Sequence, residues 1–189
     1  YNARDVYTTK ALARWVDTRL GAAQRRVYDE ITMPATRALA LMERNGFPVD
    51  AGALKVFSHF LQTEAAAQLA KMRAVAGADF NPASRPQLLN ALVAQGIVSK
   101  KKTAGGGMST DDQALEPYKK RPFVAALLRW REVTKLDSTY AQGWLSALHA
   151  DGKLHPSYRS SGTETGRPSC TRPNLSNAPR AKDTPEGRT

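Results

Sequence analysis

The chain has 189 residues, of which 41% are hydrophobic, so it can bury the core of one ordinary domain or of pieces of two. Its 28 lysines and arginines outnumber its 17 aspartates and glutamates, and the net charge of +11 favours a polyanionic partner, although it also suits an anionic membrane or mere solubility. The single cysteine, Cys170, excludes an internal disulfide and a cysteine-built zinc site. Without a long apolar run or a signal peptide, the chain is expected to be soluble and cytoplasmic, with no membrane partner.

Helical patterns dominate the first part of the chain. Apolar residues at helical spacing predict a helix over residues 5–20 and a helical stretch over residues 22–45, in which Pro34 marks a break or a new first turn. A long helix is predicted over residues 50–76, with Asp50 as its N-cap. Apolar side chains recur along this helix every three or four residues, which gives it one stripe for a core.

Two more helices are predicted farther along the chain. Ser84 is a suitable cap for a short helix that ends at Gly96, and Pro122 opens a last long helix that runs to the turn at Asp151. This last helix is expected to pack antiparallel to the helix over residues 50–76. Four aromatic side chains are expected in the core: Trp15, Trp130, Tyr140 and Trp144.

Residues 99–110 have the least usual composition in the chain, because three successive lysines are followed closely by three successive glycines. This pattern predicts a flexible, cationic tip, with Ser109 or Thr110 as the cap of the helical turn that follows it. Lysines on a loop are suited to phosphate contacts, although most such loops are only solvated. Arg131 and Lys135 lie four residues apart, so both can follow a phosphate backbone from one face of a helix.

The last forty residues contain the only β structure that the sequence predicts. Polarity alternates loosely over residues 154–160, which predicts a short strand. The expected fold class is therefore mainly α, with long antiparallel helices and a short β segment at the C-terminal end.

A dense polar motif runs from Thr163 to Pro179. Glycine, small hydroxyl residues and prolines leave it few side chains for a core, so its polar groups are expected to face a ligand. Arg167 can offer a fork of donors to phosphates or base edges, and Asn174 and Asn177 can both donate and accept hydrogen bonds. The motif therefore indicates nucleic-acid binding.

This motif resembles the T-x-T-G-R-x-S-S-x-x-P-N-L-Q-N-x-P segment of the DNA polymerase I (family A) polymerases, although Cys170 replaces the second serine and Ser176 the glutamine. Asp137 is a further departure, because relatives often have lysine there. Six other segments resemble the family in the same order along the chain: Tyr1 to Asp5, Met33 to Asp50, Ser84 to Leu88, Lys101 to Thr110, Trp130 to Tyr140 and Gly152 to Tyr158. The matched order is far more specific than any single motif.

The resemblance implies a polymerase fragment in three parts: the end of a 3′→5′ exonuclease domain with its connector over residues 1–48, a helical thumb over 49–150 with its basic tip at 99–110, and the start of the palm over 151–189. It implies primer-template duplex DNA as the partner, gripped through the sugar-phosphate backbone and the minor groove. The implied DNA-binding residues are Lys100, Lys101, Lys102, Thr103, Ser109, Thr110, Arg131, Lys135, Ser138, Thr139, Tyr140, Thr165, Arg167, Asn174 and Asn177.

The resemblance also limits the chemistry expected of the chain by itself. Tyr1 and Asp5 match the exonuclease signature, with Asp5 as one metal ligand, but the other exonuclease carboxylates are expected upstream. The palm carboxylates, which hold Mg²⁺ for nucleotidyl transfer, have no match after Thr163. We therefore expect an inactive piece of a longer polypeptide, with Mg²⁺ and catalysis supplied by the remaining palm and fingers segment on the same or a separate chain.

Two alternatives stay open on the sequence alone. One is a non-catalytic nucleic-acid clamp without a palm, which a companion segment with metal-binding aspartates would exclude. The other is a helical scaffold that recruits acidic proteins. A scaffold predicts no affinity for duplex DNA at physiological salt, so a binding measurement separates it from the other two hypotheses.

Overall fold

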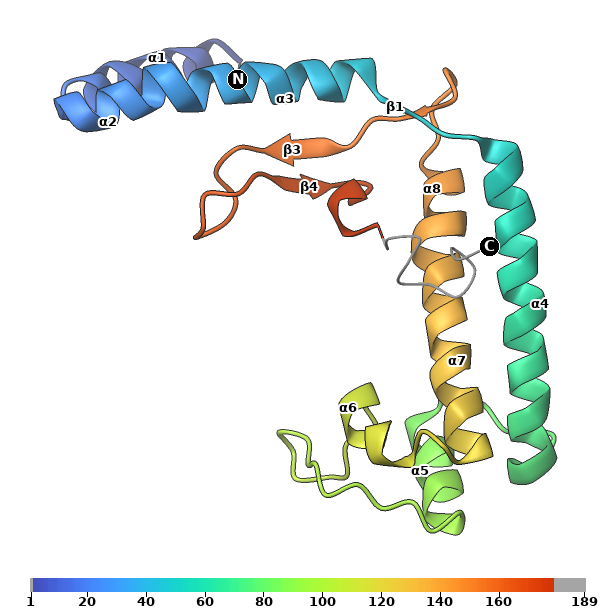
Figure 1. Cartoon of the computed structure of the whole chain (residues 1–189). Coiled ribbons are helices and arrows are strands. Elements are labelled where there is room, and N and C mark those ends of the chain that lie inside the picture. The colour runs from blue at the N-terminus through green and yellow to red at the C-terminus, as the bar shows by residue number, and fades with distance from the viewer. Residues whose placement is uncertain (1, 179–189) are drawn as a thin grey trace. The chain divides into compact units, whose positions relative to one another are not determined.

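The computed structural model describes residues 2–178, which are mainly helical, with short antiparallel strand pairs (Figure 1). The predicted fold class is therefore confirmed. The chain divides into two compact units, one formed by residues 1–48 together with 149–189 and the other by Val49–Leu148. The predicted segments at the two ends of the chain thus belong to the same unit. None of the helices in the described residues combines the length and apolar character needed to cross a membrane.

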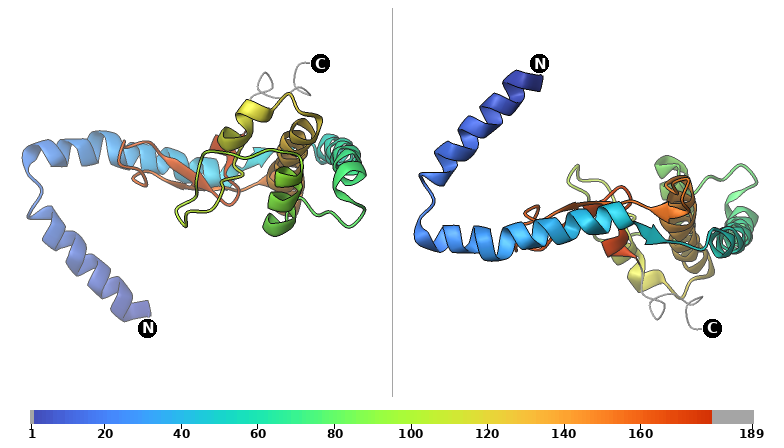
Figure 2. Two further views of the ribbon diagram at one scale, coloured as in Figure 1. Left: turned by 90° about the horizontal axis from the view of Figure 1, so that it is seen from below. Right: turned by 90° about the horizontal axis from the view of Figure 1, so that it is seen from above.

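The Val49–Leu148 unit is helical. Its elements, in chain order, are the helices α4 (Ala51–Ala76), α5 (Arg85–Ala94) and α6 (Asp112–Leu115), the 3₁₀ turn η2 (Glu116–Tyr118), the helix α7 (Pro122–Leu136), the π-helical segment η3 (Asp137–Ala141) and the helix α8 (Gln142–Ser146). Helices α4 and α7 lie side by side and run in opposite directions, as predicted (Figures 1 and 2). Asp50 caps α4 as predicted, since its Oδ1 accepts a hydrogen bond from the Ala53 N–H at 2.9 Å.

Two apolar clusters hold this unit together. The smaller cluster joins Leu61 of α4 to Val133 and Leu136 of α7, and Tyr140 packs against it. The larger cluster consists of Met72, Phe80, Leu88, Leu92, Ile97, Leu115, Phe123, Val124, Ala126 and Leu127. Because the larger cluster draws on α4, α5, α6 and α7, it fixes the end of the unit from which the 99–110 tip extends.

The helix caps differ in part from those expected. Ser84 stands at the N-cap position of α5, but its side chain makes no capping hydrogen bond. The cap of α6 is Asp111 rather than Ser109 or Thr110, since Asp111 Oδ1 accepts from the Ala114 N–H at 2.7 Å. The hydroxyl of Ser109 is instead buried and accepts from the Asp111 N–H at 3.3 Å.

The last long helix is not uniform, contrary to the prediction of one α-helix up to Asp151. It passes through the π-helical segment η3 and ends with α8 at Ser146. The carboxylate of Asp137, at the start of η3, accepts hydrogen bonds from α4, namely from Ser58 Oγ at 2.6 Å and Gln62 Nε2 at 3.1 Å. These contacts are tertiary, so the helical periodicity of the sequence contains no sign of them.

The other unit begins with three helical stretches. They are α1 (Asn2–Asp17), α2 (Ala22–Val27) followed by the π-helical segment η1 (Tyr28–Thr32), and α3 (Met33–Asn45), in which Pro34 occupies the first turn. Figure 2 shows that α1 diverges from the α2–α3 stretch. Trp15 is 53% exposed, so its predicted place in a core is wrong. The reason is that α1 buries none of its residues. The Arg19 guanidinium lies over the Trp15 ring, 4.0 Å from the ring centroid.

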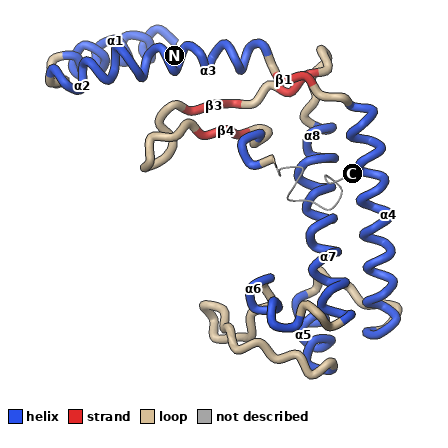
Figure 3. Tube along the Cα trace, in the orientation of Figure 1, coloured by secondary structure: helices blue, strands red, loops and turns tan. Residues whose placement is uncertain are grey.

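Two antiparallel strand pairs complete this unit (Figure 3). They join β1 (Phe47–Pro48) to β2 (Lys153–Leu154) and β3 (Ser157–Arg159) to β4 (Ser169–Thr171). The single strand predicted over residues 154–160 is therefore interrupted at His155 and Pro156, and β1 lies outside the last forty residues. Proline has no N–H to donate to a neighbouring strand, which is consistent with the interruption.

His155 ties the β2–β3 connection to the end of α3. Its Nδ1–H donates to the Glu43 carbonyl at 2.7 Å, and its Nε2–H donates to Asp151 Oδ2 at 3.0 Å. Both partners are acceptors, so only the protonated imidazolium satisfies both contacts. The Glu43 carbonyl, and secondarily the Asp151 carboxylate, raise the pKa of His155 above 6.5, while the His155 hydrogen bond lowers the pKa of Asp151 below 3.8.

These shifts predict a pH-dependent stability. The His155 contribution is complete below its unfolded pKa of 6.5 and is lost as pH rises through the folded value. The Asp151 contribution is complete above 3.8 and is lost as pH falls through its lowered value. Thermal unfolding between about pH 6 and about pH 9 should show a fall in stability that His155→Gln removes. His59→Gln, at an exposed position of α4, should leave the fall intact, and an identical pH profile for His155→Gln and the unmodified chain would contradict the assignment.

Candidate nucleic-acid interface

The tip over residues 99–110 forms a hydrogen-bonded turn. The Thr103 N–H donates to the Gly107 carbonyl at 2.8 Å, and the Gly106 N–H donates to the Thr103 carbonyl at 2.9 Å. Gly106 has a φ of 79°, a conformation that side-chain-bearing residues rarely adopt. Lys102 and Met108 pair across the turn. The glycines therefore allow a tight turn that holds the neighbouring lysines in defined positions.

The three tip lysines differ in their surroundings. Lys100 and Lys102 are exposed, and neither side chain has a hydrogen-bond or ion-pair partner within residues 2–178. Lys101 is engaged, because its Nζ lies 2.7 Å from Asp111 Oδ2 and donates to Gln113 Oε1 at 2.8 Å. Lys100 and Lys102 are thus available to an external anion, whereas Lys101 already has one.

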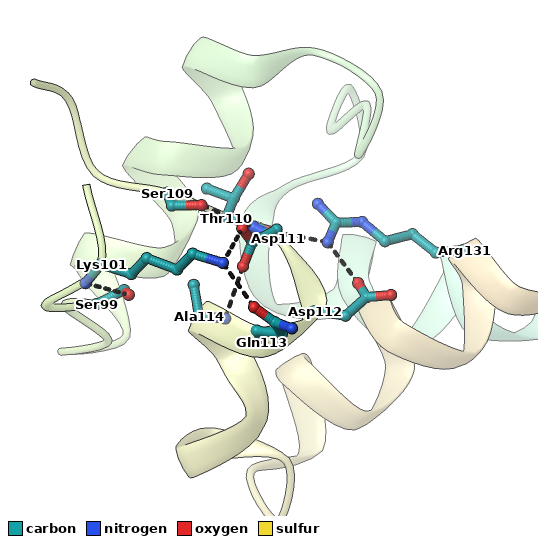
Figure 4. A network of polar contacts seen from close by, with 9 residues as sticks. All are labelled: Ser99, Lys101, Ser109, Thr110, Asp111, Asp112, Gln113, Ala114 and Arg131. Atoms are coloured by element: carbon teal, nitrogen blue, oxygen red, sulfur yellow. Dashed lines mark hydrogen bonds and ion pairs between the residues drawn. The ribbon is translucent and has the colours of Figure 1, made fainter. Parts of the chain in front are cut away.

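Arg131 and Lys135 differ in the same way, although both lie on α7. Arg131 Nη1 donates to the Thr110 carbonyl at 2.6 Å and to Asp112 Oδ1 at 3.1 Å, and its side chain is only 26% exposed (Figure 4). Lys135 is exposed, and its side chain has no partner in the part of the chain that the structure describes. The sequence predicted that Arg131 and Lys135 follow a phosphate backbone together. In the structure Arg131 contacts other parts of the protein, and Lys135 has no side-chain partner among the described residues.

The predicted hydroxyl and aromatic contacts are also unequal. Ser109 is 5% exposed, and the Thr103 hydroxyl donates to the Gly107 carbonyl at 3.2 Å. Ser138 and Thr139 are exposed on the π-helical segment η3, a type of segment that recurs at functional sites. Tyr140, in the same segment, packs against the smaller apolar cluster and makes an edge-on ring contact with Trp144 at 6.0 Å.

In the other unit, the polar motif occupies the β3–β4 connection and the residues after β4. The Thr163 hydroxyl donates to the Arg167 carbonyl at 2.8 Å, and the Gly166 N–H donates to the Thr163 carbonyl at 3.1 Å, with a Gly166 φ of 72°. This turn leaves Thr165 and Arg167 exposed, and the Arg167 guanidinium has no partner among the described residues.

The motif continues through the buried Cys170 of β4 to a 3₁₀ turn, η4 (Leu175–Asn177). Asn174 Oδ1 caps this turn by accepting from the Ser176 N–H at 3.1 Å, so the Asn174 amide nitrogen is left for other acceptors. Asn177 is exposed. Pro179, the last residue of the matched motif, lies outside the described residues.

The structure gives little support for a metal site within this chain. Asp5 is exposed in the first turn of α1, and Tyr1 lies outside the described residues. Among residues 2–178, no three His, Cys, Asp or Glu side chains are grouped so that they could hold a metal ion. The residues that the structure describes therefore do not by themselves fit a Mg²⁺ centre.

The sequence alone did not reveal the carboxylates beside the tip. Their ion pairs with Lys101 and Arg131 depend on how the turn folds back beside α7, which the spacing of these residues does not indicate. The only available signal was composition, because two adjacent aspartates follow closely after a lysine run.

The chain is similar to known proteins along most of its length. A family model described as DNA polymerase family A matches residues 51–189. DNA polymerase I from Rhizobium leguminosarum is 36% identical over 184 residues, which cover 95% of this chain and 18% of that protein. The thermostable DNA polymerase I from Thermus aquaticus is 36% identical over 157 residues, which cover 81% of this chain and 19% of that protein. The chain thus spans about a fifth of the length of these relatives.

One solved structure is similar in fold as well as in sequence. The POL domain of Pol1 from M. smegmatis, in complex with DNA primer-template and dNTP, matches with a TM-score of 0.77 and 31% identity. The match covers 86% of this chain and 29% of that one.

Proposed function

Because the chain belongs to DNA polymerase family A, we propose that it is the part of a DNA-directed DNA polymerase that holds the primer-template duplex during template-directed DNA synthesis. The observation that carries this proposal is a pair of exposed tip lysines, Lys100 and Lys102, on a hydrogen-bonded turn of a helical unit. Neither lysine side chain has a partner among residues 2–178. Duplex DNA as the partner is supported by the similar POL domain, which is in complex with DNA primer-template.

In this proposal the Val49–Leu148 unit is the thumb and grips the sugar-phosphate backbone. Lys100, Lys102 and Lys135, which have no side-chain partner among the described residues, supply the cations, and the exposed Thr139 hydroxyl supplies a neutral donor. The Ser138 hydroxyl donates to the Lys135 carbonyl at 3.4 Å, so it must turn away from that carbonyl to contact a phosphate. Phosphate contacts carry no sequence information, so a duplex of any sequence can be held and can advance by one base pair at a time. Such a grip is suited to a polymerase, because the duplex must move by one base pair after each nucleotide is added.

The motif in the other unit is proposed to contact the minor groove at the start of the palm. Arg167 and Thr165 are exposed at one turn, and Asn174 and Asn177 flank the next. Acceptors occur in the minor groove at every base pair, so an arginine there can test the shape of a pair without reading its sequence. Arg167→Ala in the parent enzyme should therefore lower discrimination between matched and mismatched primer ends.

Catalysis is proposed to come from the rest of the parent polymerase. Mg²⁺ and the carboxylates that hold it would belong to the remaining palm and fingers segment, so this chain by itself should incorporate no nucleotide. Residues 1–48 are proposed to be the end of the exonuclease domain, with Tyr1 and Asp5 as part of its site.

The proposal is tested by titrating the chain against a fluorescently labelled primed duplex at several salt concentrations. Binding should be tight at about 50 mM salt and should weaken with a slope of about 0.9 in log K against log salt for each phosphate contact. Two duplexes of unrelated sequence should bind equally. No association at about 50 mM salt would contradict the proposal, and binding of a labelled acidic polypeptide but not of the duplex would favour an acidic-protein scaffold instead.

A further inference from the structure

Two of the basic residues beside the tip are held by neighbouring carboxylates. Figure 4 shows Lys101 directed at Asp111, and Arg131 directed at Asp112 and the Thr110 carbonyl. The N–O distances are 2.7 Å for Lys101 and Asp111 and 3.1 Å for Arg131 and Asp112. These two cations therefore have carboxylate partners, whereas Lys100 and Lys102 have none in the part of the chain that the structure describes.

The geometry gives Asp111 two tasks at once. Its Oδ1 caps α6 by accepting the Ala114 N–H at 2.7 Å, and its Oδ2 holds Lys101. The hydrogen bond from Lys101, followed by that from the Ala114 backbone, lowers the pKa of Asp111 below its usual value, because both contacts favour the charged carboxylate. The lysine run is thus linked through Asp111 to the start of α6.

Arg131 makes the matching link from α7. Its side chain is largely covered, and Asp112, its carboxylate partner, is 75% exposed. The Thr110 carbonyl accepts from the same guanidinium nitrogen at 2.6 Å. Together the two ion pairs connect the tip, α6 and α7, and both lie on the part of the unit to which phosphate binding is assigned.

We propose that Asp111 and Asp112 act as internal counter-charges that restrain Lys101 and Arg131, so that the tip meets a phosphate backbone with less positive charge than its sequence carries. The inference rests on the proposed function, the binding of duplex DNA. It adds that these two carboxylates lower the affinity of the tip for the duplex. The Asp111 and Asp112 side chains are 48% and 75% exposed, and solvent weakens such ion pairs, so the restraint is mild. A mild restraint weakens the grip without abolishing it, which is what repeated translocation along a duplex requires.

The experiment compares Asp111→Asn and Asp112→Asn with the unmodified chain in duplex titrations at several salt concentrations. Asparagine retains an Oδ1 acceptor and is a good N-cap, so α6 should persist in Asp111→Asn, which thermal unfolding checks. Each variant should steepen the slope of log K against log salt by up to about 0.9, equivalent to about a 3.5-fold larger loss of affinity between about 50 and about 200 mM salt. Asp79→Asn, which makes the same charge change outside the network, should leave the slope unchanged.

A second background decides whether Lys101 is the cation that Asp111 restrains. In a Lys101→Ala chain, Asp111→Asn should no longer steepen the slope, because the released cation is missing. The inference is overturned if the two asparagine variants behave like Asp79→Asn, or if the effect of Asp111→Asn persists without Lys101. Failure of the unmodified chain to bind duplex would instead overturn the proposed function itself.

Discussion

Replacing Lys100, Lys102 and Lys135 together by alanine should weaken binding of a primed duplex by on the order of 10²–10³-fold at about 0.1 M salt. All three side chains are exposed and have no partner within the described residues, so their loss removes phosphate contacts without breaking internal ones. Each lost contact should also lower the slope of log K against log salt by about 0.9, which gives about 2.7 for the three. Fluorescence anisotropy over a range of salt concentrations measures both quantities.

The matched control replaces three exposed lysines of α1 and α4, Lys10, Lys55 and Lys71, by alanine. This variant has the same net charge as the tip variant, but it leaves the tip and α7 unchanged. Its affinity should fall far less, because a general field effect is screened over about 10 Å at this salt concentration. Equal losses for the two triple variants would mean that the chain binds duplex through overall charge rather than through the tip.

Leu127→Ala should destabilise the Val49–Leu148 unit by about 2–5 kcal/mol. Leu127 is fully buried in the larger apolar cluster on α7, where its side chain packs among residues of four helices. Truncation removes buried apolar surface and leaves a cavity that close-packed neighbours refill only in part. Urea unfolding followed by the loss of helical circular dichroism measures the change in free energy of unfolding.

Val93→Ala provides the comparison on the same unit. Val93 lies on α5 and is 57% exposed, so its truncation should change the free energy of unfolding by less than about 1 kcal/mol. If the two variants were equally stable, the larger cluster could not be the core that fixes the tip-bearing end of the unit.

The regular helices could be predicted because the caps and the apolar spacing in the sequence match the ends and the buried faces of the helices in the structure. Along α4, apolar residues recur every three or four positions, and Asp50 supplies a cap acceptor at its start. The antiparallel packing of α4 on α7 follows from two such stripes and a connection that reverses the chain. The family was predicted from several motifs in a fixed order, and the match of residues 51–189 to DNA polymerase family A confirms it.

The remaining features depend on contacts between residues far apart in the sequence. The start of η3 is bound through Asp137 to Ser58 of α4, and no period within α7 indicates that contact. Trp15 has the pattern of a core residue, but α1 buries none of its residues, and Trp15 is half exposed. Arg131 has the spacing of a surface cation, yet its guanidinium contacts Asp112 and the Thr110 carbonyl. In each case the tertiary partner, rather than local sequence, decides the role of the side chain.

The most direct measurement is the NMR mapping of a primed duplex onto the amide signals of this 20.6 kDa chain. If the tip grips the phosphate backbone, amides of residues 100–107 and of Ser138 and Thr139 should shift on titration, and salt should reverse those shifts. The amides of α1 should change least. Shifts confined to α1, with the signals of residues 100–107 unmoved, would contradict a grip through the tip.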